Sequence, residues 1–226
     1  MRIISKITFF IFLLSLYSSS AMAASDLRLW LEAGLRYRIT KKLHLGFDQH
    51  VRFDDDVSHV EEVSPEIFVR YRVVKFFRVG GGYRLIFEPL SDNGNSYTDI
   101  WHRFFVDFLF SHTMKPVTLR YRLRFQEQFG WPQDKTPETL QVKHTVRNKL
   151  GIHFNLGKGF TPFIAGEVFG RFGDKDGFLH KWRATSGLDY GYKSNEFTFF
   201  IGSEGLLDKS DEPTRIIFGL GYHYIF

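Results

Sequence analysis

The stretch that decides the fold reads Val117-Thr118-Leu119-Arg120-Tyr121-Arg122-Leu123-Arg124-Phe125-Gln126. Apolar side chains occupy its odd positions, and three arginines occupy even positions. Successive side chains of a strand point to opposite faces, whereas a helix would repeat its apolar positions every three or four residues. The stretch therefore predicts a β-strand with one apolar face and one charged face.

The same alternation recurs along most of the chain, at 29–39, 65–73, 77–87, 104–111, 140–154, 182–192 and 216–226. At the rise of a strand and a tilt near 45°, stretches of about ten to twelve residues span roughly 25 Å of hydrocarbon. The fold class predicted is all-β, a transmembrane antiparallel up-and-down β-barrel.

The connections between these stretches alternate in length. Short ones fall at 41–42, 74–76, 113–116, 156–159 and 193–195, and longer polar ones at 54–63, 88–99, 129–139, 170–179 and 207–213. Outer-membrane barrels place short turns in the periplasm and long loops outside. A soluble β-sandwich gives no reason for such alternation.

The number of strands is the open point of this fold. About eleven stretches alternate, whereas bacterial single-chain barrels have even strand numbers. Three alternatives remain: one strand is missed, the first segment is placed unusually, or the barrel closes in parallel, as in the odd-numbered mitochondrial channel. We expect ten to twelve strands and favour twelve.

The two ends of the chain predict export from the cytoplasm and insertion into the outer membrane. Arg2 and Lys6 precede an apolar run and a small-residue site at Ala21-Met22-Ala23, so we expect 1–23 to be a removed signal peptide and 24–226 a single barrel domain. The spacing of Gly221, Tyr224 and Phe226 resembles the insertion signal of outer-membrane barrels. The expected location is the bacterial outer membrane. The expected partners are outer-membrane lipids and lipopolysaccharide, periplasmic chaperones and the barrel-assembly machinery.

Composition excludes several classes of protein. The formal net charge of +5 is a modest surplus, so we expect no nucleic-acid partner. The chain has no cysteine, which removes disulfides, a thiol nucleophile and thiolate metal ligands. Aromatic residues make up 18% of the chain, as expected where apolar side chains face lipid and polar ones face a lumen.

The charged faces of the strands predict the lining of the lumen. The predicted inward charges are Arg36, Arg52, Arg70, Arg72, Arg84, Arg103, Arg120, Arg122, Arg124, Arg147, Glu66, Asp107, Glu167 and Asp189. Two interpretations follow: a salt-bridged polar core that closes a narrow barrel, or a porin-like, water-filled passage whose positive surplus favours anions.

A family resemblance rests on motifs spread over nearly the whole predicted mature chain. They are Trp30, Leu35-Arg36-Tyr37, Lys41-Lys42, Arg52-Phe53, Gly81-Gly82-Tyr83-Arg84, Arg103-Phe104, Tyr121-Arg122-Leu123-Arg124-Phe125-Gln126, Arg147-Asn148-Lys149-Leu150, Thr161-Pro162-Phe163, Glu167, Phe169, Gly187-Leu188-Asp189-Tyr190 and the strand that ends at Phe226. Their order is similar to that of the bacterial outer-membrane family called domain of unknown function 2490. The resemblance implies an outer-membrane barrel with no established activity and no catalytic residues to transfer.

No local signature marks an enzyme or a metal site. A hydrolase would need a histidine near a nucleophile and an orienting acid. The candidates are His102, His112, His144, His153, Ser111, Ser186 and Ser203. A protease of the outer-membrane aspartate–histidine type would instead use acids near the outer rim, and Asp54-Asp55-Asp56, Glu61 and Glu62 are available. Neither the acids at 54–56 nor those at 174–176 have the spacing of a calcium loop. We expect no catalytic residue, no metal, no cofactor and no enzymatic activity, with an outer-membrane lipid hydrolase or deacylase at the outer rim as the alternative.

Overall fold

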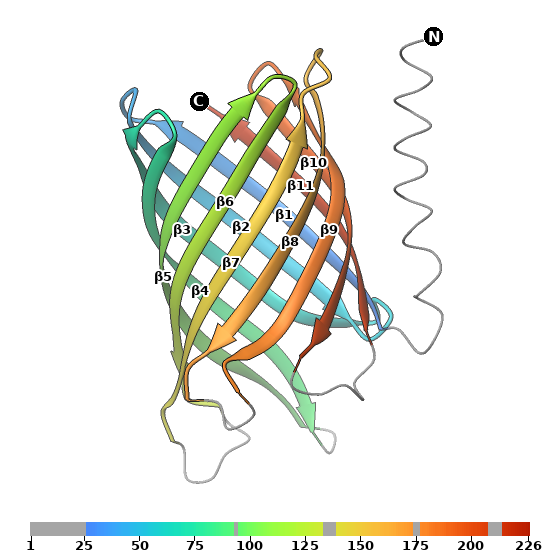
Figure 1. Ribbon diagram of the computed structural model, residues 1–226. Coiled ribbons are helices and arrows are strands. Elements are labelled where there is room, and N and C mark those ends of the chain that lie inside the picture. The colour runs from blue at the N-terminus through green and yellow to red at the C-terminus, as the bar shows by residue number, and fades with distance from the viewer. Residues whose placement is uncertain (1–25, 93–94, 133–138, 174–176, 208–213) are drawn as a thin grey trace.

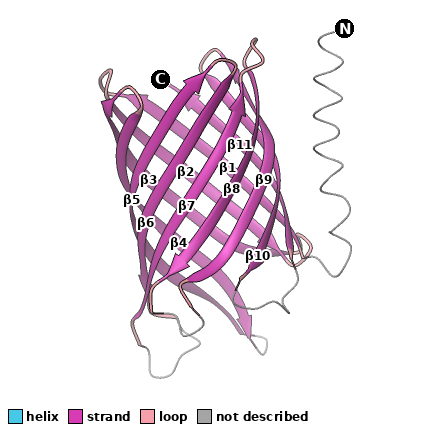
Figure 2. Ribbon diagram, viewed as in Figure 1, coloured by secondary structure: helices cyan, strands magenta, loops and turns pink. Residues whose placement is uncertain are grey.

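The computed structural model describes residues 26–92, 95–132, 139–173, 177–207 and 214–226 (Figure 1). Strands dominate these residues, and no α-helix occurs among them (Figure 2). In the described part of the chain, no helix is long and apolar enough to cross a membrane. The predicted signal peptide lies outside the described residues and stays a prediction.

Strands run through nearly all of the described chain. They are β1 (Leu27–Arg38), β2 (Leu43–Asp54), β3 (His59–Val74), β4 (Phe77–Asp92), β5 (Asn95–Met114), β6 (Val117–Gly130), β7 (Gln141–Phe154), β8 (Phe160–Arg171), β9 (Leu179–Tyr192), β10 (Asn195–Leu206) and β11 (Arg215–Ile225). They form one closed barrel in which each strand pairs with its neighbours in sequence, and β1 pairs with β11. The all-β barrel prediction is confirmed.

The closing pair differs from all the others. β1 and β11 run parallel, from Leu27 beside Ile216 to Arg36 beside Ile225, whereas the pairs of consecutive strands are antiparallel. With eleven strands described, the first and last must run in the same direction, because each hairpin reverses the chain. The count lies within the expected ten to twelve, and the favoured twelve exceeds it by one.

The two ends of the barrel carry different connections. At the turn end, which contains residues 39–42, 75–76, 115–116, 155–159 and 193–194, the strands are joined by tight turns (Figure 1). At the opposite loop end, two predicted loops are largely strand: β3 begins at His59, and β4 and β5 stay paired out to Asp92 and Asn95. Polar composition there predicted loops, but continued backbone pairing keeps those segments extended.

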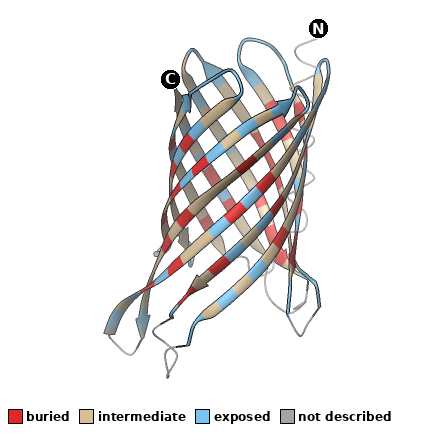
Figure 3. Cartoon of the chain, turned by 90° about the vertical axis from the view of Figure 1, so that its left-hand side faces the viewer, coloured by how far each residue is buried: buried red, intermediate tan, exposed pale blue. Residues whose placement is uncertain are grey.

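The outer wall of the barrel is apolar. Leucine, isoleucine, valine and aromatic side chains at alternate strand positions are exposed, among them Leu35, Phe47, Ile67, Phe104 and Leu220. Buried and exposed positions accordingly alternate along the strands (Figure 3). Such an exposed apolar belt is what a barrel in lipid requires.

The interior reverses the usual composition of a protein core. Eight apolar residues and sixteen polar or charged residues are buried among the described residues. Glycines make room for the larger inward side chains: a Cβ on Gly46 would lie 2.1 Å from the Phe68 ring, and one on Gly34 would lie 2.1 Å from the Asp48 carboxylate. The barrel is therefore filled by charged groups that must be neutralised in place.

Candidate functional site

The predicted lumen charges all fall on strand positions that face inward. These are Arg36, Arg52, Arg70, Arg72, Arg84, Arg103, Arg120, Arg122, Arg124, Arg147, Glu66, Asp107, Glu167 and Asp189. Most of them fall into two sets: charges that form ion pairs in the middle of the barrel, and arginines at the turn end.

Glu167 is the most heavily shared carboxylate of the middle set. Its side chain is 2% exposed, and it lies 2.8 Å from Arg122, 2.9 Å from Arg147 and 3.4 Å from Arg183. These arginines come from β6, β7 and β9, so one carboxylate on β8 connects four strands. Arg183 also pairs with Glu204 on β10 at 2.5 Å.

A second group of ion pairs lies on β2, β3 and β4. Glu62 on β3 pairs with Arg52 at 2.9 Å, and Glu66 pairs with Arg84 at 2.6 Å. Ser64 donates a hydrogen bond to Glu62. Fully paired and hydrogen-bonded charges are the form in which ions are tolerated in a protein interior.

Asp107 and Arg124 form a two-bond pair between these groups. Both bonds measure 2.7 Å, and the guanidinium lies 3.8 Å from the centroid of the Phe105 ring. Arg103 is satisfied differently, since it donates to the amide oxygen of Gln128 at 2.6 and 3.0 Å.

The parallel seam carries a cluster of carboxylates and histidines. Glu32 on β1 lies 2.7 Å from His223 on β11 and 3.2 Å from His50 on β2, and Arg36 binds both oxygens of Asp48. Glu32, Asp48 and His223 offer donor atoms close enough together to hold a metal ion. Arginine already neutralises Asp48, so we assign the cluster a structural role: it connects β1, β2 and β11.

Asp189 and the predicted insertion signal lie near the turn end. Asp189 accepts a hydrogen bond from Thr198 at 2.9 Å. The rings of Tyr224 and Phe226 are 4.8 Å apart, and the amide of Phe226 donates to the carbonyl of Arg36 at 2.9 Å. Gly221 pairs with Glu32 across the parallel seam. The predicted signal thus lies on the strand that closes the barrel.

The histidines and serines considered for catalysis are not brought together. His153 faces the lumen near Asp189 at 3.6 Å, and His112 is exposed on the outer wall at the turn end. Between described residues, no hydrogen bond joins a serine hydroxyl to a histidine ring.

The rim acids have structural partners. Asp54 lies 2.8 Å from His59, Glu61 lies 2.6 Å from Arg28, and Asp56 accepts a hydrogen bond from the amide of Leu27 at 3.1 Å. The acids at 174–176 lie outside the described residues. The rim acids hold the start of β1 against the β2–β3 turn.

The outer wall contains a polar pair that sequence reasoning missed in part. His144 Nδ1 lies 3.1 Å from Glu127 Oε2, and the two side chains are 53% and 51% exposed. Both occupy outward positions that are otherwise apolar. Glu127 is the next outward residue after Phe125 on β6, and His144 is the next after Val142 on β7. A carboxylate on the otherwise apolar face was the available sequence signal, because ionisable groups on a lipid-facing surface are costly.

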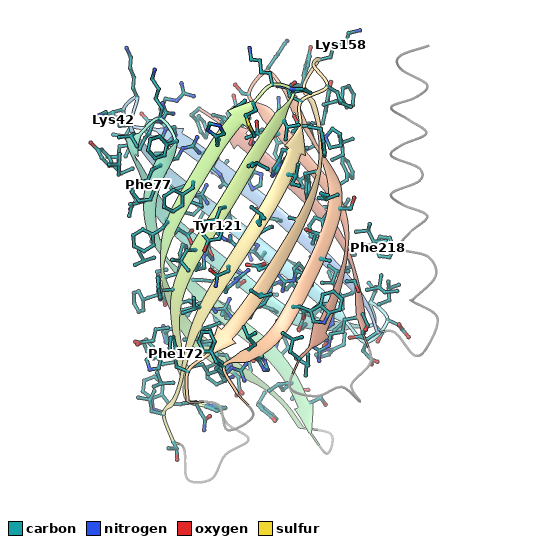
Figure 4. The ribbon with its side chains drawn as sticks, viewed as in Figure 1. Lys42, Phe77, Tyr121, Lys158, Phe172 and Phe218 are labelled. Atoms are coloured by element: carbon teal, nitrogen blue, oxygen red, sulfur yellow. The ribbon has the colours of Figure 1, made fainter. Side chains whose placement is uncertain are left out.

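A groove of about 770 Å³ opens beside this pair in the wall of the barrel. Phe104, Val106, Phe125, Val146 and Phe172 supply its apolar lining. The amide of Phe172 donates to the carbonyl of His144 at 3.1 Å, which holds this ring beside the histidine. Phe172 lies at the loop end of the barrel (Figure 4).

A second polar pair, Tyr83 on β4 and His102 on β5, also faces outward toward the loop end. The Tyr83 hydroxyl is 2.7 Å from His102 Nδ1. The His102 ring stacks on Phe129 at 5.2 Å, and Phe129 lies two positions after Glu127 on the same face. The rings of Phe104 and Phe129, which stack on each other at 6.1 Å, lie between the two pairs.

A solved structure, LpxR from Salmonella typhimurium, resembles this barrel with a TM-score of 0.50 and 8% sequence identity, over 84% of each chain. At that identity the likeness shows the outer-membrane barrel fold. It also contradicts the expectation that this barrel is not an enzyme, because LpxR, a lipid A deacylase, is an enzyme with such a barrel.

Two sequence comparisons complete this result. No curated protein matches the chain in sequence. The family model described as "Protein of unknown function (DUF2490)" matches residues 27–203, which span β1 to β10. Because this match covers most of the chain, the chain is a member of the DUF2490 family, as the motifs in the sequence indicated.

Proposed function

We propose that this protein is a lipid hydrolase of the bacterial outer membrane, which cleaves an acyl ester of an outer-leaflet lipid at Glu127 and His144. The observation that carries the proposal is the carboxylate–imidazole pair, 3.1 Å apart, on the lipid-facing wall beside an apolar groove. Ionisable groups in such a position are functional candidates by default.

The groove suits an acyl chain. Its volume of about 770 Å³ falls within the range of small-molecule sites, roughly 300–1,000 Å³. Phe104, Val106 and Phe125 extend from the polar pair toward the middle of the apolar wall. A lipid lying there would place its apolar chain on these residues and its ester near His144.

The pair has the parts of a general base. Glu127 beside Nδ1 favours the tautomer in which Nδ1 is protonated, and it stabilises the imidazolium that forms during reaction. Nε2 then takes a proton from water as the water oxygen bonds to the ester carbonyl carbon. The imidazolium returns the proton to the alkoxide oxygen when the carbon–oxygen bond breaks, which yields a carboxylic acid and an alcohol.

The location is part of the proposal. The exposed apolar belt and the barrel fold shared with LpxR support an outer-membrane position, with the turn end in the periplasm and the loop end outside. Glu127 and His144 lie toward the loop end of β6 and β7, so they would meet the outer leaflet, where lipopolysaccharide lies. The activity of LpxR supports lipid A as the substrate class to test first.

The channel interpretation has weaker support. Several of the arginines expected to line a passage are paired with carboxylates in the middle of the barrel, namely Arg122 and Arg147 with Glu167 and Arg124 with Asp107. This arrangement favours the closed polar core.

The test uses purified, refolded barrel incubated with lipopolysaccharide and, separately, with phospholipid vesicles, with the products identified by mass spectrometry. We expect released fatty acid, and a decrease of at least about 100-fold in His144→Asn, the usual scale for loss of a general base. Glu127→Gln should retain an intermediate rate. His112→Asn is the matched control, a histidine on the outer wall at the opposite end. Unchanged lipid with the unmodified barrel, or equal rates in His144→Asn and His112→Asn, would refute the proposal.

A further inference from the structure

Five arginines gather inside the barrel at the turn end: Arg38, Arg70, Arg72, Arg78 and Arg120. The strand register brings them together. Arg72 pairs directly with Arg78, and His44 lies between Arg38 and Arg70, with which it pairs on its two sides. We call this group the turn-end arginine cluster.

The cluster has no carboxylate of its own. Within the described ranges, none of its five guanidinium groups forms an ion pair or a hydrogen bond. Arg70 lies over the Phe68 ring at 4.2 Å. The acids nearest to it are already occupied, since Asp48 binds Arg36, and Asp107 binds Arg124 through two bonds of 2.7 Å.

The arginines of the cluster also repel one another. Arg72 and Arg120 both lie near enough to Arg78 to act on it electrostatically. Every short turn at this end also carries at least one lysine: Lys41, Lys42, Lys75, Lys115, Lys158 and Lys193. Figure 4 shows Lys42 and Lys158 at this end of the barrel. A concave site lined by one sign of charge concentrates counter-ions at its mouth.

Deeper in the barrel, the turn-end arginine cluster borders the ion-paired residues of the middle set. On β3, the inward residues Phe68 and Glu66 lie deeper in the barrel than Arg70, and Glu66 forms an ion pair with Arg84 at 2.6 Å. On β6, Arg120 is followed by Arg122, which pairs with Glu167 at 2.8 Å. An anion that enters from the turn end therefore meets unpaired guanidinium groups first and paired ones beyond them.

We propose that the turn-end arginine cluster is a binding site for a multiply charged phosphate-type anion. Guanidinium groups present parallel N–H donors that match phosphate oxygens, and several of them together neutralise more than one negative charge. The ligand is either a small phosphate-bearing molecule that enters from solvent or the headgroup of an anionic phospholipid at that rim. The site is independent of Glu127 and His144, which lie on the outer wall near the other end.

Calorimetric titration with inorganic pyrophosphate tests the site on full-length refolded barrel in nanodiscs of zwitterionic lipid. We expect binding that weakens with added salt, and a loss of about tenfold or more in affinity in the double variant Arg72→Gln/Arg78→Gln, because the variant removes two charged hydrogen-bond donors from the site. Lys193→Gln, an exposed turn lysine, is the matched control and should change affinity by less than about twofold.

Two further arms complete the test. If the double variant does not fold, as judged by heat-modifiable gel mobility, Arg120→Gln replaces it, because this side chain is exposed and its loss leaves the core intact. Nanodiscs with anionic phospholipid identify the source: reduced pyrophosphate binding there indicates a headgroup ligand, and unchanged binding a soluble one. Absence of pyrophosphate binding, or equal affinity in the arginine variants and Lys193→Gln, would overturn the proposal.

Discussion

Replacing Glu167 with glutamine tests whether the ion-paired core holds the barrel together. The carboxylate is 2% exposed and serves Arg122, Arg147 and Arg183 at 2.8, 2.9 and 3.4 Å. Arg183 keeps Glu204 at 2.5 Å, so the substitution leaves two guanidinium groups without a carboxylate. Breaking a buried pair costs about 3–5 kcal/mol, because the remaining charge stays desolvated and uncompensated. We expect the free energy of unfolding to decrease by that amount.

The assay is reversible urea unfolding of barrel refolded into lipid vesicles, followed by tryptophan fluorescence and heat-modifiable gel mobility. With a slope near 2 kcal/mol per molar urea, the midpoint should shift by about 2 M. Glu127→Gln is the control: it makes the same chemical change on the outer wall, where the side chain is 51% exposed, and should cost less than about 1 kcal/mol. The double variant Glu167→Gln/Arg147→Gln should recover part of the loss. Equal midpoints for Glu167→Gln and Glu127→Gln would refute the reasoning.

Three further outcomes follow from the closed barrel. Gly46→Val should lower the unfolding free energy by about 1–3 kcal/mol, because its Cβ would lie 2.1 Å from the Phe68 ring; urea midpoints measure the loss. The chain has no cysteine, so Leu29→Cys/Phe218→Cys, which pair across the parallel seam, should form a disulfide on oxidation, visible as a mobility shift on non-reducing gels. Deleting Phe226 should slow insertion into the outer membrane and leave unfolded chain in the periplasm, as shown by fractionation and heat-modifiable mobility.

Each of these variants has a matched control. Gly166→Ala should leave stability nearly unchanged, since nothing lies within 4 Å of the added carbon. Leu29→Cys/Leu220→Cys is displaced by two residues from the parallel register and should cross-link poorly; efficient cross-linking there would contradict the register. Insertion at the parent rate without Phe226 would remove the insertion signal from our interpretation.

Local alternation was enough to predict the barrel wall. In 117–126 and in the similar stretches, the period of two alone indicates which side chains face lipid and which face inward, because a strand has only two faces. The alternation of apolar and polar residues does not fix the number of strands, because that number also depends on how the barrel closes. Whether Leu27–Arg38 closes against Arg215–Ile225 in parallel is a property of the whole sheet, and no single stretch encodes it.

The sequence indicated only one of the two residues of the candidate site. His144 was one of several histidines without a signature, and Glu127 was not considered. They meet because β6 and β7 pair in a register that places the two residues opposite each other. Phe172 joins them through a backbone hydrogen bond from beyond the end of β8, which sequence spacing does not predict.

The sequence by itself determined the class of fold, the apolar outer face and the excess of arginine inside, since these follow from residue type and period. Only the tertiary structure decided which charges are neutralised. Glu167 collects arginines from three other strands, whereas Arg72 and Arg78 face each other without an acid between them. Ion pairing depends on distances across the lumen, and those distances are set by the closure and register of all eleven strands.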